Sequence, residues 1–514
     1  MKETTEFDVI IIGAGLSGIN AAYRLQTELP DYNYTILESR QEIGGTWSLF
    51  RYPGIRSDSD LHTFGFPWRP WQNEKIIADG ALIKNYIKES AEEFGIDGKI
   101  QYDHKLVAAN WSSDEQSWSL SVEESKQNEK NVAEVITKVF KAKFVIFSTG
   151  YYDYNTALKA EIPNIDSFKG VTVHPQFWPV DLDHSNKKII IIGSGATAAT
   201  LLPELAKTAA FVTMVQRSPS YFAAVPTIDK LGESIRGIFP TWLYSKLLRW
   251  KHIIGTFLVN TFCAYFPNAA RKGLTGKTAK LLPKSVPVDP HFTPSYNPWE
   301  QRLCVSPDGD FFTALKQGKA NIVTDTIKTV NSTGLITSSG VQIDADIIVT
   351  ATGLKMMMLG GAEIIVDGKT VSFPETFLWR STLIQNVPNA AVFVGYSNAS
   401  WTLGSDTGSQ LICRVLKHMR RNAFTSATPT LGSTDPFSGD DQSVALEWQG
   451  MCDRKILNLS STYFSKAKEC IPKAGDRGPW QPRSNYFSDA WGALYGSLTQ
   501  GIRYEKFESG RKDL

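Results

Sequence analysis

The chain has 514 residues, which is too long for one hydrophobic core and predicts about two to four domains. Its net charge of +2 excludes an electrostatic case for binding nucleic acid or a polyacidic partner. The five cysteines are scattered without a Cys-x-x-Cys pair, so we expect no disulfide framework, no metal site and a reducing, cytoplasmic location.

The first predicted unit is a strand, a glycine-rich loop, a helix and a second strand. Residues 7–12 are apolar except for Asp8, as in a buried parallel strand. Gly13, Gly15 and Gly18 follow, and they allow a tight turn, close approach of a pyrophosphate and close helix packing. Glu38 ends the second strand, where a carboxylate can accept both hydroxyls of an adenosine ribose. The unit predicts a dinucleotide site.

A loop with paired glycines and aromatic residues comes next. Gly45, Thr46, Trp47 and Tyr52 are candidates for the wall of a flat pocket, although such a segment on its own is more often a packed surface loop. Asp58 lies among arginines further along this loop. An acid there either holds an arginine in place or satisfies a local charge.

The chain then reaches a predicted crossing between domains. Residues 143–147 form another buried strand, and residues 152–166 are typical of a linker. His174 and Trp178 follow, four residues apart. They could lie on one face of a helical turn or fill the seam between two domains.

A second βαβ unit covers residues 188–215. Its glycine-rich loop contains Gly193, Gly195 and Thr197. After its second strand it has Arg217, where an acid would repel a 2′-phosphate and an arginine can pair with it. The alternative is that Arg217 is only a solvated surface residue. The first site therefore predicts FAD and the second NADPH.

The remaining predicted elements return the chain to the first sheet. Residues 220–292 are aromatic, basic and partly helical, and we interpret them as a helical insertion. Within them, residues 242–266 are too often interrupted by charge to span a bilayer; a buried or amphipathic helix is expected, with a peripheral membrane contact as the alternative. Residues 346–350 form a third buried strand, and residues 426–443 predict an exposed loop.

The predicted fold is α/β, with two Rossmann-like dinucleotide-binding domains, the NADPH domain being inserted into the FAD domain. The expected boundaries are residues 1–150 for the first part of the FAD domain, 151–167 for a linker, 168–350 for the NADPH domain, and 351–514 for the second part of the FAD domain and the C-terminal region.

Two further segments carry candidate residues. Arg302 follows Gln301 and has no signature of its own, since an arginine is more often a surface ion-pair partner. Trp401 precedes a predicted helix whose N-terminus could direct its amides at a flavin pyrimidine oxygen. The alternative is an ordinary turn capped by Ser400 or Thr402. Aromatic residues suggest an apolar pocket: Trp47, Phe64, Phe66, Trp68 and Trp401.

Together these motifs resemble the type I Baeyer–Villiger monooxygenases, a family of class B flavin monooxygenases, and most of all its ethionamide-activating subgroup. The resemblance covers nearly the whole chain. It rests on Phe-x-Gly-x-x-x-His-x-x-x-Trp-Pro at residues 168–179 and on both glycine loops, with segments 44–58, 216–218, 296–302 and 398–401. Related N- and S-oxygenating enzymes usually have Phe or Tyr in place of Trp178.

The resemblance implies an enzyme that uses FAD, NADPH and O2 to turn ketones into esters or lactones through a C4a-peroxyflavin, with sulfoxidation as a side activity. It implies that Arg302 is the catalytic arginine, that Asp58 orients it and that Arg217 holds the 2′-phosphate. His174 and Trp178 would couple cofactor state to domain movement.

One position departs from the family. Gln301 stands where many relatives have a lysine that also holds the 2′-phosphate, so a weaker preference for NADPH over NADH is expected. An N- or S-oxygenating flavin monooxygenase is the alternative function, and a non-catalytic nucleotide-sensing protein is a third. The ketone and the oligomeric state do not follow from the sequence.

Overall fold

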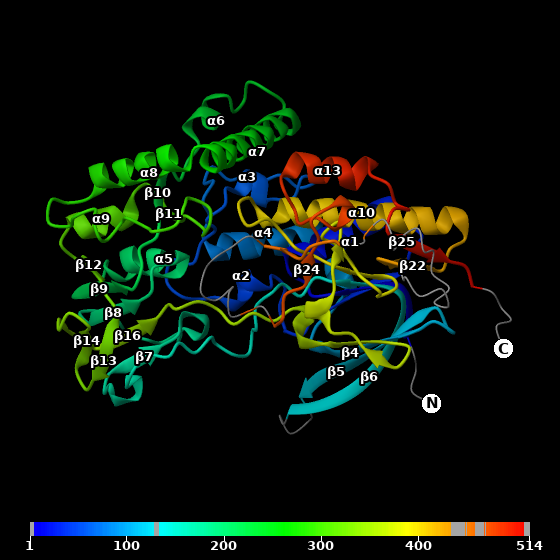
Figure 1. Ribbon diagram of the computed structural model, residues 1–514, viewed down its shortest axis with the longest axis horizontal. Helices are drawn as coiled ribbons and strands as arrows, with labels where there is room; N and C mark the ends of the chain where they lie inside the picture. The colour runs from blue at the N-terminus through cyan, green and yellow to red at the C-terminus, as the bar shows by residue number, and fades with distance from the viewer. Residues whose placement is uncertain are drawn as a thin grey trace.

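The computed structural model describes residues 5–127, 133–432, 450–457 and 469–507, together with Trp448 and Ala467. Two sheets lie side by side with helices around them, the larger on the right of Figure 1 and the smaller on the left. The prediction of an α/β fold is confirmed.

The larger sheet is built around parallel pairing of β1 with β2 and β6. Val9 of β1 pairs with Tyr34 on one side and with Phe144 on the other, so the apolar run of β1 is covered by neighbours and fully buried from Val9 to Ile11. The strands are β1 (Thr5–Ile12), β2 (Tyr34–Leu37), β3 (Ile100–Gln101), β4 (His104–Ser112), β5 (Ser117–Gln127), β6 (Ala133–Phe147), β17 (Glu363–Val366), β18 (Lys369–Thr370), β19 (Leu378–Trp379), β20 (Leu383–Ile384) and β21 (Ala390–Val392).

The smaller sheet is entirely parallel and has the order β12-β9-β8-β16-β7. Its strands are β7 (Val171–Val173), β8 (Lys188–Ile192), β9 (Phe211–Gln216), β12 (Ala320–Thr324) and β16 (Ile347–Thr350). Strands that come before β7 in the sequence pair in the larger sheet with strands that come after β16. Strand β21 lies parallel to β6, and β17 lies parallel to β4. The second Rossmann-like sheet is therefore inserted between two parts of the first, as predicted.

Helices α1 (Leu16–Glu28), α4 (Gly80–Glu93) and α10 (Trp401–Asn422) pack in the domain of the larger sheet. Helices α1 and α10 are joined by polar contacts: Arg24 pairs with Asp406 at 2.8 Å, and Asn20 donates to Ser409 at 3.2 Å. Helices α5 (Ala196–Leu205) and α9 (Asp310–Lys316) pack in the smaller domain. Two further short helices are α2 (Thr46–Leu49) and α3 (Leu61–Phe64). Other small strands are β13 (Ile327–Asn331), β14 (Gly334–Thr337), β15 (Gln342–Asp344), β23 (Arg454–Lys455) and β24 (Lys473–Ala474).

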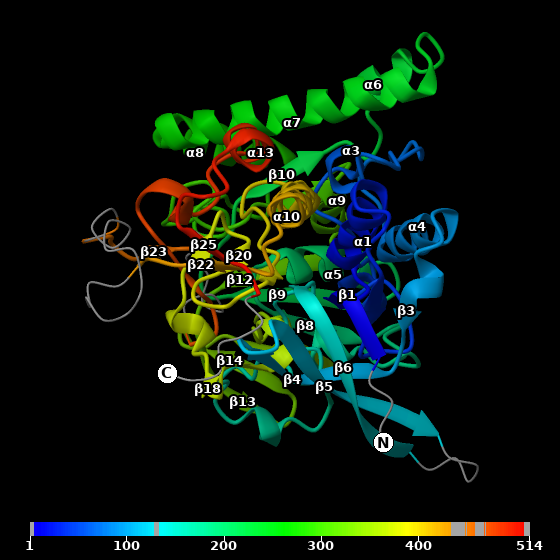
Figure 2. The ribbon, with the colours of Figure 1, turned by 90° about the vertical axis from the view of Figure 1, so that its right-hand side faces the viewer.

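The predicted helical insertion contains α6 (Lys230–Ser234), α7 (Thr241–Tyr265) and α8 (Pro267–Leu281). It also contains a strand, β10 (Phe222–Val225), which pairs in parallel with β11 (Cys304–Pro307). Figure 2 shows α7 along the top edge of the molecule, with α13 (Tyr486–Tyr495) beneath it. In the described part of the chain, no helix by itself has the length and apolar character to cross a membrane; α7 and α8 meet that test only as a pair bent by 114°.

The expectation of an exposed loop at residues 426–443 is wrong at its start. Ser426–Pro429 form β22, which is buried and pairs antiparallel with β25 (Ile502–Glu505). Residues 433–443 lie outside the described part of the chain. The serine, threonine and proline content of this segment predicted a loop. The prediction failed because the partner strand β25 comes more than seventy positions later in the sequence, and local composition does not reveal such a pairing.

Candidate active site

A cavity of about 640 Å³ lies at the carboxyl ends of β1 and β2, where doubly wound sheets bind their ligands. Its volume is in the range of a cofactor or substrate pocket. Most of the residues proposed from the sequence line it: Gly13, Gly15, Glu38, Gly45, Thr46, Trp47, Tyr52, Asp58, Thr197, Arg302 and Trp401. Gly18, Gly193, Gly195, Arg217, His174 and Trp178 lie outside this lining.

Two glycines of the first loop, Gly13 and Gly18, have no room for a side chain. Gly13 has φ +104°, and a Cβ on it would lie 2.8 Å from the carbonyl oxygen of Ser148. A Cβ on Gly18 would lie 2.0 Å from the carbonyl oxygen of Gly13, so Gly18 acts beneath the cavity by permitting close packing. Gly15 lies next to Gly45 in the cavity wall, and a Cβ on Gly15 would contact the Gly45 Cα at 3.7 Å. Backbone without side chains therefore forms the cavity wall at this point.

Glu38 is buried at the end of β2. Its carboxylate accepts the N–H of Ala14 at 2.7 Å and the N–H of Arg40 at 2.9 Å. Burial raises the pKa of the Glu38 carboxyl, and these two amides oppose that shift. A carboxylate has about four acceptor positions, so two amides leave capacity for ribose hydroxyls.

Two helix N-termini face this cavity. Helix α1 starts after Gly15 and has no side-chain cap from the residues that the structure describes. Helix α10 starts after Ser400, and Ser400 provides no side-chain cap either, while the Thr402 hydroxyl donates to the carbonyl of Phe64. The alternative of a turn capped by Ser400 or Thr402 is therefore wrong. Both N-termini offer amides to a negatively charged or polar ligand group.

These observations fit a bound dinucleotide. The loop at Gly15 leaves room for a pyrophosphate, and Glu38 is placed for a ribose. The buried hydroxyl of Ser148, in the cavity wall, has no hydrogen-bond partner among the described residues, as expected of a group that awaits a ligand. Trp401 donates from Nε1 to Ser17 at 3.2 Å and packs against Tyr151, which fixes its ring at the cavity.

Asp58 and Arg302 come from different parts of the sequence and reach the same cavity. Asp58 is half-buried, and loss of hydration raises the pKa of its carboxyl to about 6, opposed by the guanidinium groups of Arg56 and Arg302. Arg302 is an exposed side chain at the cavity wall. An arginine and a carboxylate are thus placed beside the predicted flavin pocket.

Arg56 was missed as a site residue by the sequence reasoning. It lines the cavity, its side chain is only 9% exposed, and it pairs with Asp310 at 2.8 Å. Its position two residues before Asp58 in the glycine-rich loop was the available signal. The aromatic prediction is divided, because Trp47, Phe64 and Trp401 line the cavity, whereas Phe66 and Trp68 stack on each other in the core.

The second glycine loop belongs to the smaller sheet. Gly193 has φ +133°, and a Cβ there would lie 2.2 Å from the carbonyl oxygen of Ala351. Helix α5 begins after Gly195, and Thr197 in its first turn reaches the large cavity. Arg217 is exposed directly after β9. The cavity therefore reaches the start of α5 through Ala196 and Thr197, whereas Gly193, Gly195 and Arg217 lie outside its lining.

The segment with His174 and Trp178 contacts both stretches of chain that connect the two sheets, one near Asp153 and the other near Gly353. His174 Nδ1 accepts the N–H of Gln176 at 3.2 Å, and its Nε2 lies 3.3 Å from the carbonyl oxygen of Gly353. Gln176 donates to the carbonyl of Asp153 at 2.7 Å. The predicted helical face is not formed, since His174 caps a 3₁₀ turn that ends before Trp178, and Trp178 packs on the core of the smaller domain.

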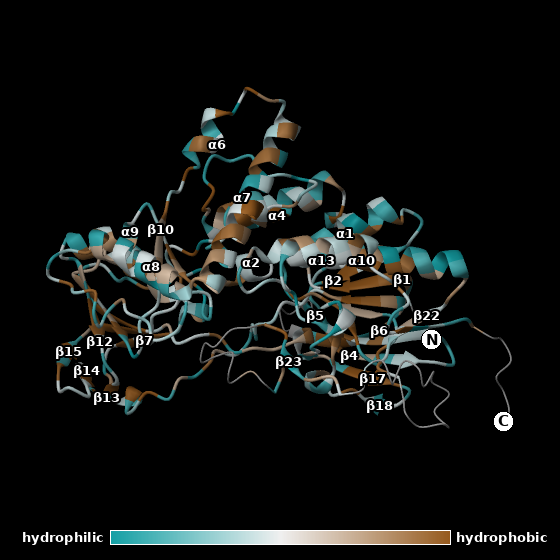
Figure 3. Cartoon of the chain, turned by 45° about the horizontal axis from the view of Figure 1, so that its top comes forward, coloured by the Kyte–Doolittle hydropathy of each residue, from teal (hydrophilic) through white to brown (hydrophobic). Residues whose placement is uncertain are grey.

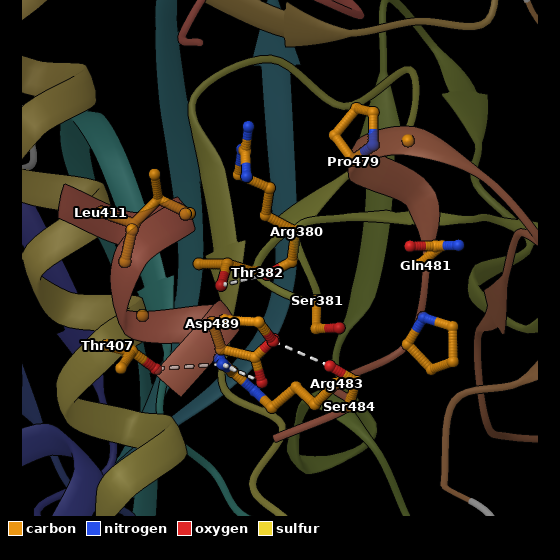
Figure 4. A pocket seen from close by; sticks show the side chains of 16 residues that line it. Arg380, Ser381, Thr382, Thr407, Leu411, Pro479, Gln481, Arg483, Ser484 and Asp489 are labelled. Atoms are coloured by element: carbon orange, nitrogen blue, oxygen red, sulfur yellow. Dashed lines mark hydrogen bonds and ion pairs between the residues drawn. The ribbon is translucent and has the colours of Figure 1, made fainter. Parts of the chain in front are cut away.

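A second cavity, of about 250 Å³, lies between α10 and α13 (Figure 4). Arg483 extends to Thr407 and donates to its hydroxyl at 3.0 Å, and it also donates to the carbonyls of Val394 and Gly404. Arg483 also lies 4.0 Å from Asp489 of α13. The network fastens α13 to α10.

Comparison with known proteins agrees with this geometry. Residues 11–75 match the NAD(P)-binding Rossmann-like domain, and residues 70–240 match the flavin-binding monooxygenase-like family. The FAD-containing monooxygenase EthA of Mycolicibacterium smegmatis is 42% identical over 506 residues, which is 98% of this chain and 96% of the relative. The putative FAD-containing monooxygenase MymA of Mycobacterium tuberculosis is 42% identical over 501 residues, 96% of this chain and 97% of the relative.

Solved structures share the fold. An oxidized steroid monooxygenase bound to NADP has a TM-score of 0.74 and 18% identity, over 98% of this chain and all of that one (100%). An open crystal structure of cyclohexanone monooxygenase has a TM-score of 0.72 and 18% identity, over 98% and 100%. The chain belongs to the family of FAD-containing monooxygenases, and the resemblance found in its motifs is confirmed.

Proposed function

We propose that this enzyme is a Baeyer–Villiger monooxygenase that depends on FAD and NADPH. The reaction consumes one ketone, one O2, one NADPH and one proton, and yields one ester or lactone, one NADP+ and one water. The observation that carries the proposal is the position of Arg302, beside Asp58, in the wall of the cavity that also contains Gly15 and Trp47.

The residues of the first loop would hold FAD. Gly13 and Gly15 leave space for the pyrophosphate, Glu38 would accept the ribose hydroxyls, and Gly45 with Trp47 would lie along the flat ring. Thr46, Tyr52 and Trp401 complete the pocket wall. When bound and reduced, this cofactor supplies the activation of O2.

The residues of the second loop would hold NADPH. Gly193 and Gly195 precede the N-terminus of α5, and Thr197 reaches into the shared cavity. Arg217, exposed after β9, would pair with the 2′-phosphate. His174 and Trp178 would couple the two domains, because their segment contacts both crossings.

Arg302 would stabilise negative charge in the transition state. Its guanidinium stays protonated, so it can face an oxygen anion without giving up a proton. Insertion of oxygen beside a carbonyl develops negative charge on the carbonyl oxygen, and a fixed cation lowers the energy of that state. Asp58 would hold Arg302 in position. Trp47, Phe64 and Trp401 give the cavity an apolar side that suits an uncharged ketone.

Product analysis tests the proposal. The purified protein, loaded with FAD, would be incubated with NADPH and 18O2 and offered a ketone, the sulfide of the same shape and the matching tertiary amine. Mass spectrometry should find an ester that contains one 18O atom, with one NADPH consumed for each ester. Amine or sulfide oxide as the only product would instead assign the chain to N- or S-oxygenating enzymes.

A further inference from the structure

Helix α7 presents apolar side chains on its outward face. Leu247, Ile254, Leu258 and Tyr265 recur at spacings of seven, four and seven residues, which places them on one side of the helix. The exposed large apolar side chains of α7 range from 37% accessible for Phe257 to 78% accessible for Tyr265. Figure 3 shows the brown colour of hydrophobic residues along this helix. A helix at the edge of a protein ordinarily has polar residues on that face.

Helix α13 continues the apolar face. Phe487 packs against Trp250 and Phe257 of α7, with ring centroids 6.1 Å and 5.1 Å apart. Beyond this contact, Trp491 and Tyr495 of α13 are 68% and 66% exposed. We call the exposed apolar side chains of α7 and α13 together the α7–α13 face. Arg483, just before α13, holds this helix on α10, because it donates to Thr407 of α10 at 3.0 Å and lies 4.0 Å from Asp489 of α13 (Figure 4).

The segment that contains α7 and α8 carries only positive charge. Between Glu233 and Asp289 the sequence has no acidic residue. It has nine basic residues, namely Arg236, Lys246, Arg249, Lys251, Arg271, Lys272, Lys277, Lys280 and Lys284. Lys246, Lys272, Lys277, Lys280 and Lys284 are exposed. The whole chain has a net charge of only +2, so this positive charge is concentrated locally.

The opposite side of α7 is held firmly by the rest of the protein. Arg249 donates to the carbonyls of His62 and Gly65 at 2.8 Å and 2.7 Å. Asn260 donates to the carbonyl of Asn398 at 2.8 Å, three residues before Trp401 in the cavity wall. Helix α7 is therefore anchored on the side that faces the candidate active site, and its exposed apolar side chains lie on the opposite side.

We propose that the α7–α13 face docks on the surface of a lipid bilayer that contains anionic lipids. A helix lying flat in the membrane interface buries its apolar stripe among the acyl chains, while lysines and arginines beside it contact anionic headgroups. The exposed aromatic rings and the basic segment supply both parts of that interaction. Exposed apolar surface of this kind marks an interaction site.

Charge complementarity favours a bilayer over a second copy of this chain. A self-complementary interface would bring two copies of the basic segment together and repel. An anionic membrane offers negative charge over an extended plane, and α7 and α13 lie along one edge of the molecule, where such a plane can contact both helices. This inference goes beyond the oxygenation reaction, because lipid binding can be measured without turnover.

Vesicle sedimentation of the full FAD-loaded chain tests the inference. Vesicles of phosphatidylcholine alone would be compared with equimolar phosphatidylglycerol and phosphatidylcholine. We expect binding to the anionic vesicles, weakened by salt. The variant Leu258→Gln/Trp491→Gln should lower the bound fraction by about tenfold or more, since it removes apolar contact. Lys246→Glu/Lys272→Glu/Lys277→Glu should do the same by reversing charge.

Matched controls change exposed residues elsewhere. Val180→Gln/Val341→Gln and Lys169→Glu/Lys328→Glu should bind vesicles as the unaltered chain does. Flavin content and melting temperature establish that each variant is folded. Failure of the unaltered chain to sediment with anionic vesicles would overturn the inference. So would equal binding by all variants, or a dimer in solution that Leu258→Gln/Trp491→Gln converts to a monomer.

Discussion

Arg56 donates from Nη1 to Asp310 at 2.8 Å, and this ion pair joins residues 254 positions apart in the chain. Arg56 lies in the glycine-rich loop of the larger domain, and Asp310 begins α9 of the smaller domain. The same guanidinium donates to the carbonyl of Val305, three residues after Arg302. The ion pair therefore sets the distance between the loop that carries Asp58 and the segment that carries Arg302.

Replacement of Arg302 by Ala should abolish ketone oxygenation. We expect the rate of ester formation to fall by about 100- to 1,000-fold, the usual cost of removing a group that stabilises a developing oxyanion. Reduction of the flavin by NADPH should persist, because it does not need that charge. Stopped-flow absorbance for the flavin and chromatography for the ester separate the two steps. Arg51→Ala, an exposed arginine in the loop that carries Asp58, serves as the control. Unchanged ester formation would remove Arg302 from the mechanism.

The pH dependence should report the ionisation of Asp58. Its carboxyl has a pKa raised to about 6, so it is charged above that pH and neutral below it. Since only the charged form attracts Arg302, the rate of ester formation should decline as the pH falls through about 6. Asp58→Asn should have a lower rate at every pH and lack this decline. If the variant kept the same acid limb, a different group would be responsible.

Loss of the Glu38 carboxylate should weaken the binding of FAD. Glu38→Ala removes the acceptor of the Ala14 and Arg40 amides together with the proposed ribose contact. A hydrogen bond to a charged group contributes about 1.5–3 kcal/mol, which corresponds to about 10- to 100-fold in the FAD dissociation constant. Fluorescence titration of the deflavinated protein measures that constant. Glu123→Ala on β5, whose side chain is 41% exposed and lies outside the cavity lining, should leave it unchanged.

The preference for NADPH over NADH should depend on Arg217 and Gln301. Arg217→Ala should raise the KM for NADPH by about tenfold, equivalent to about 1.4 kcal/mol of binding, and leave the KM for NADH unchanged. Gln301→Lys adds a cation where many relatives have one and should lower the KM for NADPH alone. Steady-state kinetics with both nucleotides measure these effects. An equal change for both nucleotides would mean that neither residue recognises the 2′-phosphate.

The sequence by itself determined the local machinery. Gly13, Gly15 and Gly18 could be assigned because a tight turn and a close helix contact exclude side chains over a few consecutive residues. Glu38 followed from the same unit, and the structure places it at the cavity. Patterns of this kind depend on backbone conformation within one short segment, so they are visible in the chain before it folds.

Only the tertiary structure decided how distant segments meet. The pairing of Arg56 with Asp310, the cover that β25 places over β22, and the position of Arg302 in the cavity all join residues far apart in sequence. The alternative that Thr402 caps its helix failed for the same reason, since the Thr402 hydroxyl donates to the distant carbonyl of Phe64. Such contacts depend on the packing of whole domains, and the physical forces behind them act through space with no fixed spacing along the chain.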